Sequence, residues 1–400
     1  MTALPRITAA QRRARLVVRH LLAPGVRKDT AGGVAEALVG LHATDPATVY
    51  LAVAARMRAP TAAAIDHSLY HAPDGLPGLE RIRCMRRTMF VVPAHLAPAI
   101  QSATTRDAGH HRTHATARLR EALGWSERRC ARVEQAVLEA LVVRGGATAA
   151  QLAGDIPDLR EQIVMSPGKP YESRQRASAP LLGLLAAEGR IRRARPTGSW
   201  TSAQFRWTLA HPLPRIPETE AKTALARHYL AAFGPVTLDD LKWWTGWTVT
   251  DTRRALAATG PQAVELDEGT GYVLPEDLPH LQSLQDLERA EDHEPAAVLL
   301  PSLDPTPMGW RHRHWYLDPE HTKALFDRNG NIGPTIWWNG RIIGTWAQHK
   351  DGHINHRLLT DPGSEARTAV EAEIRRTLAF LDGTRVTPCY RTPLERRLAA

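Results

Sequence analysis

Cysteine is rare in this chain of 400 residues, which contains only Cys84, Cys130 and Cys389. The three residues are far apart, and none stands in a Cys-x-x-Cys pair or in a spacing with histidine that is typical of zinc ligands. This usage favours reduced thiols over a disulfide framework. It gives no indication of a structural zinc.

Long apolar runs are also missing. No run reaches the roughly 18 residues that a membrane span requires, and no opening segment combines a charged stretch with the apolar core of a signal peptide. We therefore expect a cytoplasmic protein that does not associate with membranes.

The common short signatures of catalysis are absent as well. The sequence has no GxxxxGK[ST] phosphate loop, no GxSxG nucleophile elbow and no glycine fingerprint after a strand. These absences argue against nucleotide hydrolases, serine hydrolases and dinucleotide-dependent enzymes. Any chemistry must use scattered side chains with water as the co-reactant, and we expect no cofactor.

Lysine is scarce although the chain is basic. The net charge is +9, and only six of the 51 basic side chains are lysines, which leaves 45 arginines. A strongly basic balance is typical of proteins that bind polyanions, and arginine forks onto phosphate groups. A GC-rich genome would produce the same preference for arginine, so this bias alone does not decide between the two explanations.

Two stretches share one order of elements: a helix, a short helix, a longer helix, and two strands joined by a turn. This order is typical of a winged helix. In the first copy the predicted helices span 128–145, 148–153 and 173–189, and the strands 190–196 and 203–209 flank Thr197-Gly198-Ser199. The second copy lies within 221–275.

The ends of the chain differ in texture. The N-terminal region offers a third winged helix, with predicted helices at 7–22, 30–43 and 46–57 and a strand at 87–93. From about 294 onward, β-branched and aromatic runs alternate with Asn-Gly and Asp-Gly turn signals, and a helix at 364–383 closes the chain.

The predicted fold is therefore mainly α with β: three tandem winged-helix domains plus a small C-terminal β-barrel or sheet with a closing helix. The predicted boundaries are 1–115 for the first winged helix, 116–215 for the second, 216–292 for the third, and 293–400 for the C-terminal domain. No heptad seam is evident, and we expect a monomer.

The hairpin of the second winged helix is rich in cations around one aromatic residue. These residues are Arg190, Arg192, Arg193, Arg195, Trp200 and Arg206. Winged proteins use such ribbons on phosphates or in the minor groove, and an apolar wedge can unstack base steps. The alternative is a solvated wing whose Trp200 packs on its own domain.

Two other segments are basic and rich in rings. Arg311 and Arg313 stand in the run RHRHW and are candidates for contact with nucleic acid. In 106–120, His110 and His114 are four residues apart, a spacing compatible with a metal on a helix, but no HExxH carboxylate accompanies them. A basic surface is the preferred interpretation there, and we predict no metal.

The stretch GLHATDPATVY, residues 40–50, is an unusually polar corner between two apolar helical runs. Asp45 is placed to cap the helix that begins with Pro46, which gives Asp45 a structural role. His42 and Thr44 are left to point out of the corner. The positive helix N-terminus would help to keep His42 neutral and able to accept a proton from water, although a satisfied core histidine is the simpler alternative.

Six segments in this order resemble the bacterial winged-helix DNA glycosylases of the azinomycin-resistance type. They are GLHATDP, RRTMFVVPAHL, LLGLLAAEGRI, AAFGPVTLDDLKWWTG, LLPSLDPTPMGWRHR and PTIWWNGRIIGTW. The resemblance covers nearly the whole chain. It implies three winged helices and a C-terminal β-barrel that form a C-shaped basic cleft around DNA, and the excision of bulky alkylated purines.

The resemblance also assigns the catalytic positions. The Gln-aliphatic-Gln or Gln-aliphatic-Asp triplet of that family corresponds here to His42, Ala43 and Thr44, so neither glutamine is kept. Histidine can orient water and add basicity, and the Thr44 hydroxyl can hold the water or contact the sugar. His42 and Thr44 are therefore the predicted catalytic residues.

The implied function is a monofunctional DNA glycosylase acting on double-stranded DNA with bulky, intercalating natural-product adducts at guanine N7. It would serve antibiotic self-resistance or DNA repair and associate with the nucleoid. No lysine lies in or beside 42–44 to support a lyase step. The alternatives are a non-catalytic winged-helix DNA-binding protein, either a damage binder or a transcriptional regulator, and an RNA-binding protein.

Overall fold

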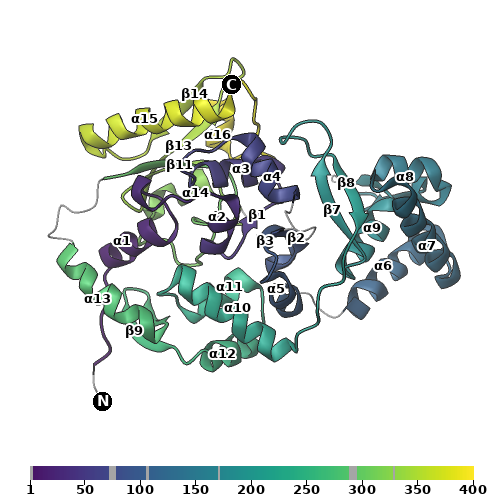
Figure 1. Ribbon diagram of the computed structural model, residues 1–400, viewed down its shortest axis with the longest axis horizontal. Coiled ribbons are helices and arrows are strands. Elements are labelled where there is room, and N and C mark those ends of the chain that lie inside the picture. Colours follow the sequence, from purple (N-terminus) through teal and green to yellow (C-terminus); the bar gives the residue numbers. More distant parts are fainter. Residues whose placement is uncertain (1–2, 72–77, 105–107, 170–171, 288–294, 328) are drawn as a thin grey trace.

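The fold is mixed α/β. The computed structural model describes residues 3–71, 78–104, 108–169, 172–287, 295–327 and 329–400 (Figure 1). Among these residues, no helix is both long and apolar enough to cross a membrane.

The N-terminal region carries a small sheet surrounded by helices. Its helices are α1 (Ala9–Arg19), η1 (Pro24–Val26), α2 (Ala31–Ala37), α3 (Pro46–Ala54), α4 (Ala62–Tyr70) and α5 (Ala97–Thr104). The antiparallel sheet has the order β1 (Leu41–His42), β3 (Met89–Pro93), β2 (Leu79–Arg83), and η2 (Met85–Arg87) joins β2 to β3. The helices expected over 7–22 and 46–57 and the strand expected over 87–93 are present with trimmed ends. The helix expected over 30–43 is wrong in its last turn: α2 ends at Ala37, and residues 41–42 form β1 because they pair with β3.

The segment from α6 (Ala108–Leu123) to β8 (Phe205–Leu209) forms a lobe at the right of Figure 1. Its other elements are α7 (Glu127–Arg144), β4 (Ala147–Thr148), α8 (Ala149–Asp155), η3 (Pro157–Arg160), β5 (Gln162–Met165), β6 (Ser173–Arg176), α9 (Ser178–Ala187) and β7 (Ile191–Pro196). A core of its own includes Trp125, Val137, Leu181 and Ile191. The predicted β7–β8 hairpin is confirmed and lies on the side of the lobe that faces the rest of the molecule (Figure 1).

Local signals place several of these ends correctly. Gly145 ends α7 in the left-handed conformation at φ 61°, and Thr148 caps α8 in a capping box with Gln151. The helix expected over 173–189 is wrong in its first turn, because 173–176 form β6 and pair with β5. The polar run Ser-Arg-Gln-Arg has no apolar helical face to bury, whereas pairing with β5 satisfies its backbone.

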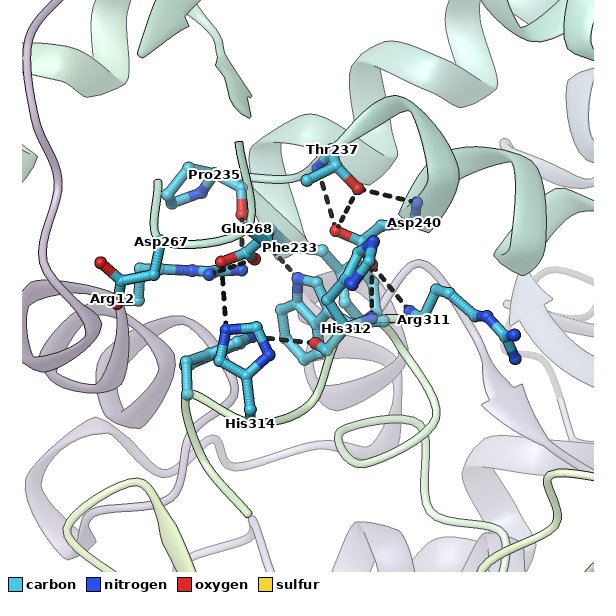
Figure 2. Close-up of polar contacts among 12 residues, drawn as sticks. Arg12, Phe233, Pro235, Thr237, Asp240, Asp267, Glu268, Arg311, His312 and His314 are labelled. Atoms are coloured by element: carbon cyan, nitrogen blue, oxygen red, sulfur yellow. Dashed lines mark hydrogen bonds and ion pairs between the residues drawn. The ribbon is translucent and has the colours of Figure 1, made fainter. Parts of the chain in front are cut away.

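The next segment repeats the order of helices and hairpin. It contains α10 (Glu218–Phe233), α11 (Leu238–Thr245), α12 (Val249–Ala258), β9 (Gln262–Leu266), β10 (Gly269–Val273), η4 (Pro275–Asp277) and α13 (Leu278–Leu287). Helices α10, α11 and α12 share one core with α1, α5 and the C-terminal strands, whereas α13 packs with the β9–β10 hairpin in a separate small core. Asp240 of α11 accepts hydrogen bonds from the backbone N–H groups of Arg311 and His312 at 2.7 and 2.9 Å (Figure 2).

The C-terminal region is a four-stranded antiparallel sheet, in the order β11 (Ala297–Leu300), β12 (Thr335–Trp338), β13 (Arg341–Gln348), β14 (Ile354–Leu358). Asn339 and Gly340 form the β12–β13 turn, both at positive φ, as the Asn-Gly pair predicts. The predicted closing helix is α15 (Gly363–Leu381), which packs on this sheet, and η5 (Pro319–His321), α14 (Thr322–Leu325) and α16 (Pro393–Leu398) complete the chain.

Two of the expected domain boundaries can be compared with the helices and with the range of described residues. Helix α6 runs without a break through residues 115 and 116. The boundary expected at 292/293 lies outside the described residues.

Candidate active site

The segment 40–46 is held in an extended path beside β3. His42 pairs with Phe90 in the β1–β3 ladder, and the N–H of Ala43 donates to the carbonyl of Met89 at 2.8 Å. A side chain at Gly40 would stand 2.9 Å from a methyl of Val92, so only glycine lets the chain enter this close to the strand.

Successive side chains of this segment point to opposite sides, as extended backbone requires. Leu41 and Ala43 are fully buried in the core formed with α2, α3 and α4. The His42 ring lies 5.0 Å from the ring of Phe90, which belongs to the core shared with α10 and α11. His42 and Thr44 therefore lie on the opposite side of the segment from Leu41 and Ala43, outside the core formed with α2, α3 and α4.

Asp45 anchors the end of the triplet. Its side chain accepts from the N–H of Ala47 at 3.1 Å, and so caps α3, and its second carboxylate oxygen accepts from the N–H of Cys389 at 2.8 Å. The cap thus also joins the corner to the C-terminal segment. No sequence signal indicated the bond to residue 389.

His42 is a buried, neutral imidazole. Its side chain is almost fully covered, and Nδ1 has no hydrogen-bond partner among the described residues. Burial lowers the pKa of His42 to about 4, and the nearby Arg86 cation lowers it further in the same direction. The neutral state matches the sequence-based expectation, but its causes are burial and Arg86 rather than the helix N-terminus.

Thr44 lines a cavity of about 360 Å³, which we call the Thr44 cavity. Its Oγ1 is buried without a partner among the described residues. Strand β2, the end of α9 and strand β7 enclose this cavity, and Tyr390 closes one side. The cavity therefore lies between the N-terminal sheet and the lobe.

This arrangement offers a proton acceptor and a hydroxyl two residues apart, both unpartnered. Buried polar atoms are nearly always hydrogen-bonded in folded proteins, so two such atoms on one edge suit a water or substrate oxygen. A neutral imidazole in this setting can take a proton from water.

Comparison with known proteins assigns the chain to a family. The family model "DNA glycosylase AlkZ-like" matches residues 35–380. The chain belongs to the AlkZ-like DNA glycosylase family. The solved structure of the Streptomyces sahachiroi DNA glycosylase AlkZ is similar to it, with a TM-score of 0.69 and 20% sequence identity over 95% of this chain and 98% of that chain. A comparison with curated proteins found no match.

Membership of the AlkZ-like family confirms the resemblance noted from the sequence, and it makes DNA the macromolecule on which this chain acts. The matched range includes the triplet at 42–44, the β7–β8 hairpin and, apart from Tyr390, the residues that line the Thr44 cavity. At 20% identity, the likeness to the solved structure establishes the fold and leaves the roles of single residues to be argued from this chain.

The cations of the β7–β8 hairpin are engaged by protein groups. Arg190 pairs with Glu134 at 2.9 Å, and Arg195 pairs with Asp66 at 3.0 Å. Arg192 pairs with Glu80, and Arg206 donates to the carbonyl of Gly146 at 2.7 Å. Arg193 lies over the rings of Phe205 and Trp207. Of these cations, Arg192 and Arg193 line the Thr44 cavity.

Trp200, expected at the hairpin tip, packs on the protein. Its ring stacks on Tyr50 at a centroid distance of 5.1 Å and lies 5.9 Å from Phe380 of α15. These contacts are with the N-terminal and C-terminal regions rather than with the lobe that carries the hairpin.

Arg311 and Arg313 lie away from the Thr44 cavity. The Arg311 side chain is exposed and extends away from the Asp240 cluster in Figure 2, and it lines a second cavity. The Arg313 guanidinium lies 4.3 Å from the ring centre of Phe326 and 4.9 Å from that of Trp243.

The histidine-rich segment 106–120 is mostly helix α6. His111 lines the Thr44 cavity, whereas residues 106–107 and the side chain of His110 lie outside the described part of the chain. Arg112 of this segment pairs with Glu134 and Glu188 and ties α6 to α7 and α9.

Sequence reasoning missed two residues at the site. Arg86 acts on His42 through its charge, and Tyr390 lines the Thr44 cavity from the C-terminal tail. Arg86 stands in the quoted segment RRTMFVVPAHL, so the motif contained it without indicating its role. Tyr390 is separated from Thr44 by more than three hundred residues, and no local pattern could have indicated it.

Proposed function

We propose that this chain is a monofunctional DNA glycosylase that hydrolyses the N-glycosidic bond of bulky N7-alkylguanine adducts and leaves an abasic site. The observation that carries the proposal is the unpartnered hydroxyl of Thr44, which lines a cavity, two residues along the extended segment from the buried His42 with its unpartnered Nδ1. The substrate is double-stranded DNA bearing an alkylated purine, such as an intercalating natural product attached to guanine N7.

The chemistry needs few groups. Alkylation at N7 makes the guanine cationic, so the base leaves as a neutral molecule when it takes the electron pair of the bond between N9 and C1′. Water forms the new bond to C1′ and gives its proton to the His42 imidazole, while Thr44 Oγ1 orients that water or the sugar. A general base of this kind contributes about 10²–10⁴-fold to the rate.

A lyase step requires an amine nucleophile. In the described part of the chain, the residues that line the Thr44 cavity include no lysine. This composition supports hydrolysis without strand cleavage.

The architecture that we propose is three winged-helix units and a C-terminal domain arranged as a C around DNA. The order of helices and hairpin in 127–209 and again in 218–273 supports two of the units. The hairpin residues Arg190, Arg192, Arg193, Arg195, Trp200 and Arg206, with Arg311 and Arg313, would exchange their protein contacts for DNA. The net charge of +9 supports a polyanionic partner.

We place the protein as a monomer in the cytoplasm, associated with the nucleoid when bound to DNA, in antibiotic self-resistance or DNA repair. The AlkZ-like family and the similar structure support a role in repair or resistance.

The test is incubation with a duplex that carries one defined guanine-N7 adduct, followed by assays for released base and for alkali-labile abasic sites. His42→Ala should lower the single-turnover rate by about 10²–10⁴-fold. His42→Gln, which restores the residue common in the family, should retain more activity. His353→Ala, at an exposed position before β14, is the matched control.

The competing function is a damage-binding protein or regulator without catalysis. Tight binding to the adducted duplex by wild type and His42→Ala alike, with no base released by either, would establish that function for the adduct. Release of N7-methylguanine as fast as of any bulky adduct would refute the substrate class proposed here.

A further inference from the structure

The connection between β2 and β3 has an uncommon backbone. Arg86 and Arg87 follow one another with φ of 51° and 62°, in the left-handed region that residues with a Cβ seldom occupy. Neither is glycine, asparagine or aspartate, the residues that tolerate this region best. Such strain persists where the surrounding structure enforces it and is concentrated at functional sites.

Helix α11 enforces the position of Arg86. Gly246, the left-handed C-cap of α11, packs against Arg86, since a Cβ on Gly246 would lie 3.6 Å from the Arg86 Cα. The Arg86 guanidinium lies 4.4 Å from the ring centre of Trp243, and Nη2 donates to the carbonyl of Asn329 at 3.3 Å. The cation is therefore presented at one place, near His42.

A second cation shares the same indole ring. Arg313 stands 4.9 Å from the ring centre of Trp243, and its Nε and Nη2 are buried with no hydrogen-bond partner among the described residues. Burial lowers the pKa of Arg86, and the charge of Arg313 lowers it further, while Asp327 opposes both. The unpaired N–H donors of Arg313, together with the repulsion between the two cations, would favour a bound anion nearby.

Arg86 and Trp243 also line a second cavity of about 910 Å³, which we call the Trp243 cavity. Its basic lining residues are Arg86, Arg87, Lys222, Lys242 and Arg311. Among the described residues, Lys222 is the one of these five with ion pairs to carboxylates within 4.0 Å, to Glu218 and Asp251. The charges of the other four are not paired with a carboxylate of the described residues, although Arg86 also donates to the carbonyl of Asn329.

Arg87 and Thr104 line both cavities. The Arg86–Arg87 turn thus separates the Thr44 cavity from the Trp243 cavity. A strand of DNA that brings a sugar to His42 and continues into the Trp243 cavity must pass this turn.

We propose that the Arg86–Arg87 turn binds a backbone phosphodiester of the damaged strand and thereby positions the sugar of the adducted nucleotide at His42. The inference rests on the proposed glycosylase function. The ligand is a phosphodiester because guanidinium groups match the charge and the forked geometry of its two free oxygens. Arg86 and Arg87 are positioning residues; they take no part in proton transfer.

The experiment is a scan in which each phosphate near the lesion is replaced by a neutral methylphosphonate. At one phosphate, wild-type kcat/KM should fall about 10–100-fold, the size of one lost charge-assisted contact. Arg86→Gln should lose about the same amount on native DNA and almost nothing more at that phosphate. Arg367→Gln, on the exposed face of α15, should follow the wild type at every position.

Arg87→Gly provides a variant that the backbone favours. Glycine accepts the positive φ of this position, so the melting temperature should stay the same or rise while kcat/KM falls and the same phosphate loses its effect. If the loss in kcat/KM caused by each variant and the loss caused by each methylphosphonate were independent at every phosphate, so that the combined loss was always their product, the proposal would be overturned.

The same comparison of protein variants and replaced phosphates can be made by measuring binding affinity for the DNA, which does not require base release. A protein that releases no base but shows the same coupling between Arg86 and one phosphate would refute the glycosylase function and keep the phosphate site. Base release with no coupling at any phosphate would refute the site and keep the function.

Discussion

Trp200 of the β7–β8 hairpin stacks on Tyr50 of α3, with ring centroids 5.1 Å apart and planes inclined by 28°. The Tyr50 hydroxyl donates to Asp66 at 2.8 Å, and Asp66 also pairs with Arg195 of the hairpin. The hairpin that extends from the lobe (Figure 1) is therefore fastened to the N-terminal region, and its residues Arg192 and Arg193 line the Thr44 cavity.

Removal of the Trp200 ring should loosen this attachment. We expect Trp200→Ala to expose the hairpin to trypsin at Arg193 and Arg195, whereas Trp200→Phe, which keeps an aromatic face, should remain close to wild type. Limited proteolysis with mass spectrometry of the first cut measures the effect. Equal cleavage rates for all three proteins would mean that the stack does not hold the hairpin.

The low pKa of His42 predicts the pH dependence of catalysis. Since the pKa is lowered to about 4, the imidazole is neutral from pH 8 down to about pH 5, and single-turnover rates should be flat over this range. The rate should fall only as the pH approaches 4, after subtraction of spontaneous depurination. An inflection between pH 6 and 7 would show that His42 titrates normally and is not the buried base.

His20 predicts how stability depends on pH. Its Nε2 donates to the carbonyl of Ala232 and its Nδ1 accepts from the Thr306 hydroxyl, so the folded protein holds it neutral. Burial, aided by Arg56, lowers its pKa to about 3. Below pH 6.5 the unfolded chain gains a proton that the folded chain refuses, so stability should fall with pH by about 1 kcal/mol between pH 6.5 and 5.5 from this residue.

Urea denaturation at the two pH values measures this loss of stability. The pKa of His42 is lowered as well, so His42 should add a loss of similar size over the same pH range. His20→Gln should reduce the difference between the two pH values even if it lowers stability at both. An unchanged difference would assign the pH dependence to other groups.

A buried ion pair should be essential to the joint between the N-terminal and C-terminal regions. Arg56 and Asp304 are both completely buried, with N–O distances of 2.7 and 2.8 Å. Asp304→Ala would leave the arginine charge unpaired and should lower the free energy of unfolding by about 3–5 kcal/mol. Asp361→Ala, which breaks the exposed pair with Arg367, should cost less than about 1 kcal/mol. Similar losses for both variants would contradict the burial argument.

Removal of both buried partners separates charge from packing. In Arg56→Met with Asp304→Ala, no isolated charge remains, so part of the stability lost in Asp304→Ala should return. A double variant less stable than either single variant would mean that packing around Arg56 outweighs its charge.

Much of the secondary structure could be predicted because its causes are local. The caps of α8 and of α3, the glycine stop after α7 and the Asn339–Gly340 turn depend on residues within a few positions of each other. The family resemblance drew on the order of such segments. The helix expected at 173–176 was wrong because the competing interaction was a strand partner at 162–165.

The candidate site was predictable only in part. The polar triplet after Gly40 and the cap at Asp45 can be read in the sequence, and so can the expectation of a neutral imidazole. The charge of Arg86, the bond from Asp45 to Cys389, the cover of Tyr390 and the docking of Trp200 join residues far apart in the chain.

By itself, the sequence determined the elements, their order and the residue types at the corner, because hydrophobic period, caps and turn residues act over one or two turns of backbone. Only the tertiary structure decided which side of that corner is buried, which cation lowers the pKa of His42, and which distant side chains enclose Thr44. These outcomes depend on the packing of separate cores against one another, and packing is set by long-range contacts that no local pattern encodes.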